Sequence, residues 1–459
     1  MTNTWKWAAL IYVALIGLLL QIGFTDRRHR DDYTPVPLPA QSRNTEQSLQ
    51  DAIVAMNHRT TLAVYEQSGK CSPAWNAAAR EVIEAFNRVN SEFPDHPAFS
   101  SILDPARAVI DKGCHDPLLL YIYGKALFET QNFGATQNYQ AAIPYLREAM
   151  DGFAASKYPK ILTRHAPDLL AQCLEKTGQQ DGLSKTRQQA LAWTVDALTD
   201  GSIKPGEEPI ILDTQESLDQ IYSAPLPELL DALKARKLET LYVSRVLEGR
   251  YHISMGWEAR GHVSAKQVTP NGWKIYHKNM AEAEAILVPA WKAHPEFYEA
   301  PEEMITVAMG RREAGSTRMW FDRTVAARFD EMSAYDAYAK SINPYWYGSC
   351  DAMYKFGLEC LRTNRFDTQV PFYLWIMHDS IRDIDHQAWS RLNVYPQLKV
   401  MFSGYAKQHV IGHLDWKRYL HVAAGWRYRD ELGAKDIILA YGMKVDADYQ
   451  QAQSAGDTH

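Results

Sequence analysis

Three short segments of the sequence place aromatic side chains beside charged ones, a combination that can line a binding pocket. Their members are Trp257, Glu258 and Arg260, then Trp320, Asp322 and Arg323, and finally Tyr345 and Trp346. An arginine offers a planar fork of donors that matches a carboxylate, and aromatic rings supply apolar walls. If the segments converge, we expect a pocket for a peptide end, a polar glycan or a small acid. The alternative interpretation is that the rings fill seams between helices while the charge pairs fasten loops.

A run of acidic residues and histidines, HDSIRDIDH at His378–His386, is the second chemical candidate. On one continuous helix, Asp379, Asp383 and His386 share a face at spacings of four and three, which suits a divalent metal. One helix supplies too few ligands, however, and no matching cluster stands out elsewhere in the sequence. Helix capping and salt bridges to neighbouring arginines explain the run more simply. We therefore predict neither a metal site nor a cofactor.

Reaction signatures are missing from the sequence. It contains no P-loop, no G-x-G-x-x-G at a strand–helix junction, no C-x-x-C, no H-E-x-x-H and no G-x-S-x-G. The net charge of −6 leaves no basic footprint, so we do not expect nucleic-acid binding as a main role. A membrane-bound hydrolase that uses scattered Asp, Glu and His residues remains an alternative, because active sites also assemble from distant residues.

The elements that must position these residues have helical spacing, which predicts an all-α fold. Asp116-Pro117 and Ser72-Pro73 have the residue types that begin helices, a capping side chain followed by proline in the first turn. A pair of helices follows Asp116 with the large–small–large pattern of tetratricopeptide-type repeats. The positions in this pattern are Leu120, Gly124 and Leu127, then Ala142, Leu146 and Ala149. Small residues there let two helices approach closely.

Two further stretches resemble such pairs, namely 166–198, interrupted at Gly178, and 416–441. Together the pairs indicate a helical-repeat-like body of tetratricopeptide or Sel1-like type, although a generic helical hairpin explains each pair about as well. Leu49–Glu66 is the first helix candidate. Glu239–Val263 is ambiguous, because its glycines and β-branched residues fit either a short hairpin or an irregular loop. We interpret the first aromatic segment as a glycine-flanked turn within it, the second as the start of a helix, and the third as following a proline turn.

The N-terminus predicts a membrane anchor. Trp7–Phe24 is uncharged, and with Trp5 and Lys6 it reaches the roughly 20 residues needed to cross a bilayer. A buried core helix is one alternative and a cleaved signal peptide is another, although no A-x-A-like cleavage site follows. Residues 25–48 are charged and then alternate Pro35, Pro37 and Pro39, which favours an extended spacer that holds the body off the membrane.

The side of the membrane on which the body lies stays open. Arg27, Arg28 and Arg30 follow the anchor and favour a cytoplasmic body. That the membrane is a bacterial inner membrane is implied only by the family resemblance given below. Cys71 and Cys114 both lie just before expected helix starts, where a disulfide would argue for an oxidising compartment. The alternative is that the five cysteines are small apolar residues.

We expect a helical domain at 49–200, a central helical domain at 201–370, helical hairpins at 371–445 and a disordered tail at 446–459. The central region resembles an uncharacterised bacterial family, domain of unknown function 4034. The resemblance covers roughly residues 200–370 and lies in segments 255–261, 287–291, 304–310, 319–329 and 343–356. It implies a bacterial source and a helical domain, but no activity and no catalytic residues. The sequence as a whole therefore predicts a membrane-tethered helical scaffold that binds a protein or an envelope component without catalysis.

Overall fold

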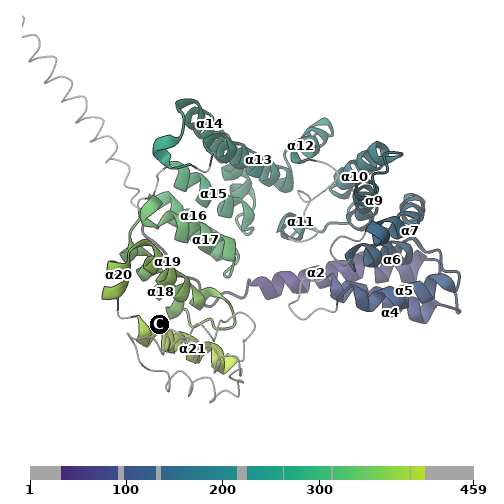
Figure 1. The fold of residues 1–459 in the computed structure, drawn as a ribbon, viewed down its shortest axis with the longest axis horizontal. Coiled ribbons are helices and arrows are strands. Elements are labelled where there is room, and N and C mark those ends of the chain that lie inside the picture. Colours follow the sequence, from purple (N-terminus) through teal and green to yellow (C-terminus); the bar gives the residue numbers. More distant parts are fainter. Residues whose placement is uncertain are drawn as a thin grey trace, which may run out of the picture. The chain divides into compact units, whose positions relative to one another are not determined.

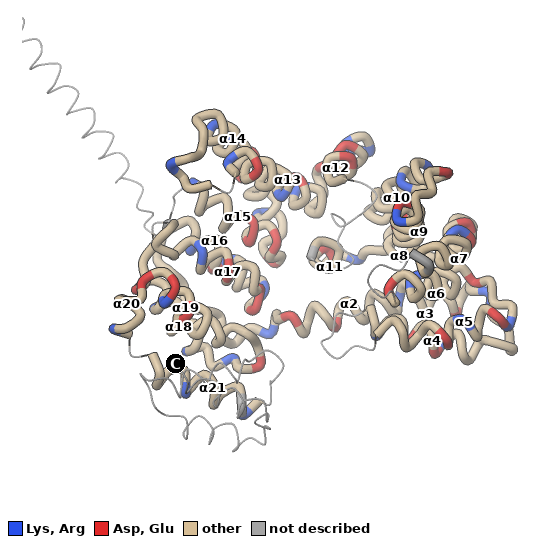
Figure 2. The backbone as a smooth tube through the Cα atoms, viewed as in Figure 1, with Lys and Arg blue, Asp and Glu red and all other residues tan. Residues whose placement is uncertain are grey.

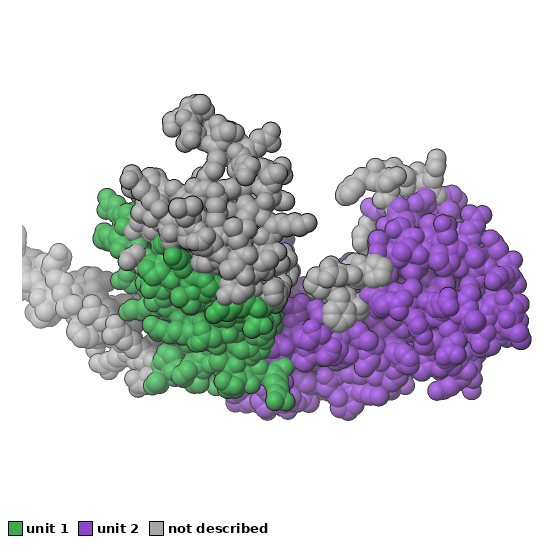
Figure 3. Space-filling model, turned by 90° about the horizontal axis from the view of Figure 1, so that it is seen from below, with its two compact units in different colours: residues 1–43, 301–459 green, residues 44–300 purple. Residues whose placement is uncertain are grey.

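The computed structural model describes residues 33–90, 98–130, 136–213, 225–261, 263–311, 314–346, 348–392 and 394–408. Within these ranges the chain consists of helices and loops without a β-strand, which confirms the predicted all-α class. The chain divides into two compact units, shown in green and purple in Figure 3. Unit 1 comprises residues 1–43 and 301–459, and unit 2 comprises residues 44–300. These limits differ from the expected domain boundaries at 200 and 370.

Unit 2 is built from helix pairs and short connecting helices (Figure 1). Its described helices are α2 (Glu46–Thr60), α3 (Leu62–Ser68), α4 (Asn76–Val89), α5 (Ser100–Asp111), α6 (Pro117–Glu129), α7 (Thr136–Ala154), α8 (Lys160–Thr163), α9 (His165–Lys176), α10 (Leu183–Ala197), α11 (Glu208–Asp213), α12 (Leu226–Ala235), α13 (Tyr242–Arg260), η2 (Ala265–Gln267) and α14 (Pro270–Ala293). Helices α10 and α12 contact each other, so no boundary falls near residue 200.

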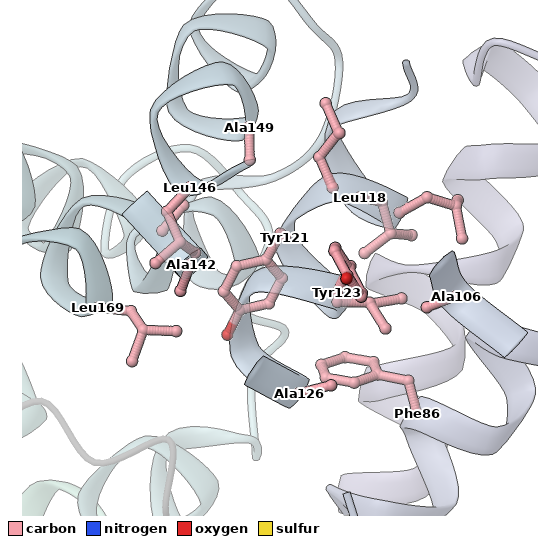
Figure 4. Packing of buried hydrophobic residues seen from close by; sticks show 14 of the residues in the cluster. Phe86, Ala106, Leu118, Tyr121, Tyr123, Ala126, Ala142, Leu146, Ala149 and Leu169 are labelled. Carbon is pink, nitrogen blue, oxygen red and sulfur yellow. The ribbon is translucent and has the colours of Figure 1, made fainter. Parts of the chain in front are cut away.

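The α6–α7 pair confirms the predicted close approach of two helices. The Asp116 carboxylate accepts a hydrogen bond from Leu118 N–H at 2.9 Å and so caps α6, as expected from the Asp-Pro start. A Cβ atom added at Gly124 would lie 2.7 Å from Leu146 Cδ2, so any larger residue there would force Leu146 to shift. Figure 4 shows Ala142, Leu146 and Ala149 on α7 in the surrounding apolar cluster. The predicted break at Gly178 is also confirmed, because it lies between α9 and α10 with a φ of +70°.

Most of the ambiguous segment 239–263 is the 19-residue helix α13. Both the short hairpin and the irregular loop are therefore wrong for residues 242–260, as is the glycine-flanked turn expected at Trp257–Arg260. Gly249 and Gly256 do not bend the chain; a Cβ at either position would lie 2.6 Å from a side chain of α14, Leu287 or Met280. Both glycines allow α13 and α14 to lie side by side (Figure 1).

Two predicted helix starts need correction. The first helix candidate is two helices, because Thr61 leaves helical geometry and its hydroxyl donates to Asn57 O at 2.6 Å. The Ser72-Pro73 start is displaced: Ser72 O accepts bonds from Trp75 N–H and Asn76 N–H in a turn, and α4 begins only at Asn76.

Unit 1 contains the remaining described helices. They are α15 (Glu299–Arg311), whose first two residues belong to unit 2, α16 (Ala314–Ala327), α17 (Met332–Ser341), η3 (Pro344–Trp346), α18 (Cys350–Arg362), η4 (Val370–Phe372), α19 (Tyr373–Ile384), α20 (His386–Arg391) and α21 (Tyr395–Gln408). Its core includes stacked and edge-to-face rings from α16 to α19, among them Phe321, Tyr335, Phe356 and Tyr373. A Cβ at Gly357 of α18 would lie 2.9 Å from Leu374 Cα of α19, so these helices pack tightly across residue 370.

Several expectations fall outside the described residues. They are the anchor at 1–24, the first part of the spacer, the helix pair at 416–441 and the tail at 446–459. In the part of the chain that the structure does describe, no helix combines the length and the apolarity that a membrane crossing requires. Figure 2 shows that acidic and basic residues are interspersed along the described helices.

Candidate functional site

The first predicted set, Trp257, Glu258 and Arg260, lies at the C-terminal end of α13 in unit 2. The Arg260 guanidinium carbon is 5.2 Å from the centre of the Trp257 ring and 5.5 Å from that of Trp273, so both rings contact the cation. Arg260 Nη1 also donates to Gly261 O at 3.0 Å and to Val263 O at 3.2 Å. Arg260 therefore fastens the loop that follows the helix, while the Glu258 side chain is exposed.

The second set lies in the middle of α16, not at a helix start as expected. Trp320 is buried, and the Arg323 guanidinium carbon lies 4.3 Å from the centre of its ring. Burial lowers the pKa of Arg323. The neighbouring Asp322 is buried and points to different partners.

The third set, Tyr345 and Trp346, belongs to the turn η3, as the proline turn predicted. Tyr345 is 77% exposed, and its N–H donates to Asn343 Oδ1 at 2.9 Å. Trp346 has the ammonium group of Lys340 5.7 Å from its ring centre. Each of the three sets has its own local contacts, which is the pattern expected of rings and charges that fasten loops and helix seams.

Asp322 leads to the most developed polar site of unit 1. Arg318, one helical turn earlier on α16, donates from Nε to Asp322 Oδ1 at 2.7 Å. The two remaining nitrogens of Arg318 form a bidentate pair with the carboxylate of Glu359 on α18, at 3.0 and 2.6 Å. Burial alone lowers the pKa of Arg318, but the hydrogen bonds to Glu359 and the charges around it raise the pKa overall. The guanidinium is thus held fixed by two carboxylates.

The fixed pair binds a distant part of the chain, the segment Tyr33–Ser42, called here the docked segment. Asp322 Oδ2 accepts the Val36 N–H at 3.0 Å and the Tyr33 hydroxyl at 2.8 Å. Arg318 Nη2 donates to Val36 O at 2.8 Å. Both main-chain groups of Val36 are therefore engaged by one ion pair, while its side chain is 54% exposed.

A second arginine continues this recognition along the docked segment. Arg365, in the loop after α18, donates from Nη1 to Ala40 O at 3.1 Å and to Ser42 O at 2.7 Å. Asp367 holds the other side of its guanidinium at 2.7 Å, and the ring of Phe329 lies 4.7 Å from the guanidinium carbon. The hydrogen bond to Asp367 raises the pKa of Arg365 and lowers the pKa of Asp367.

Arg318, Asp322, Glu359, Arg365 and Asp367 are called here the arginine clamp. The clamp binds three main-chain carbonyls and one N–H, so it recognises backbone groups more than a particular series of side chains. The carbonyls of Ala40 and Ser42 lie at a turn. Side-chain contacts add limited selectivity: Leu38 is buried and the Tyr33 hydroxyl is bonded, whereas Pro35 and Pro37 are exposed. Prolines favour the extended conformation before binding, which lowers the entropy cost of docking.

The docked segment corrects the interpretation of residues 25–48 as a free spacer. Residues 33–39 have neither helix nor turn, a turn follows at residues 40–41, and α2 begins at Glu46. The part up to Ser42 is bound within unit 1. The physical reason is the arginine clamp, whose members are hundreds of residues away in the sequence. Burial, followed by the hydrogen bond to Asp322, raises the pKa of Tyr33 to about 12.

The predicted metal candidates Asp379, Asp383 and His386 do not share one continuous helix, so the geometric premise is wrong. Helix α19 ends at Ile384, and Asp385 has extended geometry and caps α20 with hydrogen bonds to two N–H groups. Asp379 and Asp383 both pair with Arg382, at 3.1 and 3.0 Å. Among the described residues, no group of three or more His, Cys, Asp or Glu side chains is arranged to hold a metal ion.

Sequence reasoning singled out Asp322 but missed Arg318, Glu359 and Arg365. A signal for the first existed: Arg318 and Asp322 are four residues apart on a helix whose neighbouring positions Phe321 and Val325 are buried. Charged residues of opposite sign on a buried helix face require partners. No local pattern could have indicated that the partner is Val36.

Comparisons with protein families, with curated proteins and with solved structures found no match for this chain. The resemblance of the central region to domain of unknown function 4034 therefore stays a prediction.

Proposed function

We propose that this protein is a membrane-tethered helical scaffold without catalytic activity, which binds extended, proline-interrupted peptide segments through the arginine clamp of unit 1. The observation that carries the proposal is the pair of hydrogen bonds from Arg318 and Asp322 to the main chain of Val36. Glu359 holds this ion pair in place, and the pair bonds to both the N–H and the C=O of one residue. Such an arrangement can bind a peptide, because every peptide offers these two groups.

The proposal assigns the docked segment the role of an intramolecular ligand. A segment held mainly by its backbone can be replaced by another of similar conformation, such as a proline-containing stretch of a protein partner. The predicted anchor at residues 1–24 would place this exchange at the membrane. All-helical architecture is compatible with such a scaffold.

The groups on which a hydrolase would depend have structural roles that explain their positions. Asp322 bonds to Tyr33, Val36 and Arg318, and the buried His378 accepts a hydrogen bond from Trp389 Nε1 at 2.7 Å. These observations favour the scaffold over the hydrolase.

The experiment uses a full chain in which residues 33–42 are replaced by an equally long glycine–serine stretch, called here the vacated chain. A fluorescent peptide with the sequence of residues 33–42 is titrated with the vacated chain and with the intact chain. We expect saturable binding to the vacated chain and at least tenfold weaker binding to the intact chain, whose own segment fills the site. Equal binding to both chains, or no binding to a folded vacated chain, would sink the proposal.

A further inference from the structure

Two cysteines of unit 2 lie in loops that hydrogen bonds hold side by side. Cys71 follows α3 and Cys114 precedes α6. The Lys70 N–H donates to Asp116 Oδ2 at 2.8 Å, and Lys70 Nζ donates to His115 O at 3.0 Å. Lys70, which precedes Cys71, is thus hydrogen-bonded to His115 and Asp116, which follow Cys114.

Both cysteines lie in the neighbourhood of Tyr65, a buried residue of α3. Cys71 Sγ donates to the Tyr65 main-chain oxygen at 3.6 Å, and Cys114 belongs to the same apolar cluster as Tyr65. Burial and then the nearby Cys71 and Cys114 thiols raise the pKa of Tyr65. Cys71 also contributes to the raised pKa of Cys114, after the larger effect of burial.

The two thiols differ in their access to solvent. Cys71 is exposed, whereas Cys114 is completely buried, and both are free in this structure. The other cysteines are placed differently: Cys173 and Cys360 are buried within helices, and Cys350 begins α18 in unit 1. A small oxidant can therefore reach Cys71 directly, whereas Cys114 is shielded from solvent.

We propose that Cys71 and Cys114 form a modification site, at which a low-molecular-weight disulfide oxidises the two thiols to an intramolecular disulfide. In the first step the Cys71 thiolate attacks the small disulfide, and one small thiolate leaves. In the second step the Cys114 thiolate attacks the Cys71 sulfur of the mixed disulfide, and the second small thiolate leaves. Two protein thiols have then lost two protons and two electrons, and the small disulfide has been reduced to two thiols.

The structure implies two properties of this reaction. Burial raises the pKa of Cys114 to about 11, so its thiolate is scarce at neutral pH and ring closure accelerates as the pH rises. The product closes a loop from residue 71 to residue 114 that contains α4 and α5. Such a cross-link restricts the unfolded chain, so the oxidised form should unfold at a higher temperature.

The test treats the full chain in detergent micelles at pH 8.5 with mixtures of oxidised and reduced glutathione. The samples are acidified, alkylated and digested with trypsin, and peptide 71–80 linked to peptide 113–125 is sought by mass spectrometry. Thermal unfolding of the same samples is followed by tryptophan fluorescence. We expect the linked peptide and a rise in Tm of several degrees, both reversed by a dithiol reductant.

The controls separate this pair from general thiol oxidation. Cys71→Ser and Cys114→Ala should each abolish the linked peptide and the rise in Tm, whereas Cys350→Ala should retain both. Because Cys71 is exposed, we expect Cys71→Ser to fold like the unsubstituted chain. The proposal would be overturned if Cys71 stopped at the mixed glutathione disulfide, if both thiols stayed open to alkylation, or if the linkage joined other cysteines.

Discussion

Asp322 accepts a hydrogen bond from the N–H of Val36 at 3.0 Å, although 286 residues separate the two in the sequence. This bond lies at the centre of the arginine clamp. It turns a stretch that has the composition of a free spacer into a bound segment of unit 1. The carboxylate can do this because Arg318 fixes its other oxygen at 2.7 Å and Glu359 in turn fixes Arg318.

The first prediction concerns Arg318. Arg318→Ala leaves the carboxylates of Asp322 and Glu359 without their buried cation, and should lower the free energy of unfolding by about 3–5 kcal/mol. Arg362→Ala is the matched control in unit 1, because Arg362 on α18 is exposed and surface substitutions usually change the free energy of unfolding by at most about 0.5 kcal/mol. Urea unfolding of both variants checks the difference. Equal losses of unfolding free energy in the two variants would show that the ion pairs of Arg318 add no particular stability.

The second prediction is a pH dependence of docking. The pKa of Tyr33 is raised from 10.0 to about 12 in the docked state, so the docked state favours the protonated hydroxyl. Its contribution is therefore fully present below about pH 10 and is lost as the pH rises towards 12. The peptide of residues 33–42 should bind the vacated chain more weakly above pH 10, by no more than about tenfold per pH unit. A Tyr33→Phe peptide should lack this dependence; the same slope for both peptides would refute the role of the hydroxyl.

The third prediction addresses the α13–α14 pair of unit 2. Gly249→Ala places a methyl group against Leu287, whose nearest atoms would lie 2.6–3.0 Å away, and should cost about 1–3 kcal/mol of unfolding free energy despite the better helix propensity of alanine. Gly256→Ala meets mainly the terminal methyl of Met280, which can move, and should cost less. Thermal unfolding of both variants measures the order. A larger loss for Gly256→Ala would contradict this packing.

The fourth prediction concerns the membrane anchor predicted at residues 1–24. The full chain should remain in the membrane fraction after an alkaline carbonate wash, and a chain without residues 1–24 should be released into the supernatant. The mass of the mature protein distinguishes an anchor from a cleaved signal peptide. An anchored chain keeps the apolar stretch, whereas cleavage removes it. Release of the full chain by carbonate would count against the anchor.

How far the sequence predicts this molecule depends on the range of the interactions. The Asp116 cap and the small residue Gly124 are local patterns, and both predicted the α6–α7 pair correctly. Gly249 and Gly256 led to the wrong prediction of a hairpin or loop, because glycine is typical both of turns and of close helix packing. Their spacing of seven residues, about two helical turns, was the signal for packing. The candidate site divides in the same way: Asp322 was found, but its bond to Val36 depends on the tertiary fold.

The most direct test of the central claim removes one main-chain hydrogen from the peptide. Two peptides of residues 33–42, one with Val36→Pro and one with Val36→Ala, are titrated with the vacated chain by fluorescence anisotropy. Because the Val36 side chain is exposed, the alanine peptide should bind like the original. The proline peptide lacks the N–H that Asp322 accepts and should bind at least tenfold more weakly, as expected for the loss of a hydrogen bond to a charged group. Equal affinities of the two peptides would contradict backbone recognition by the arginine clamp.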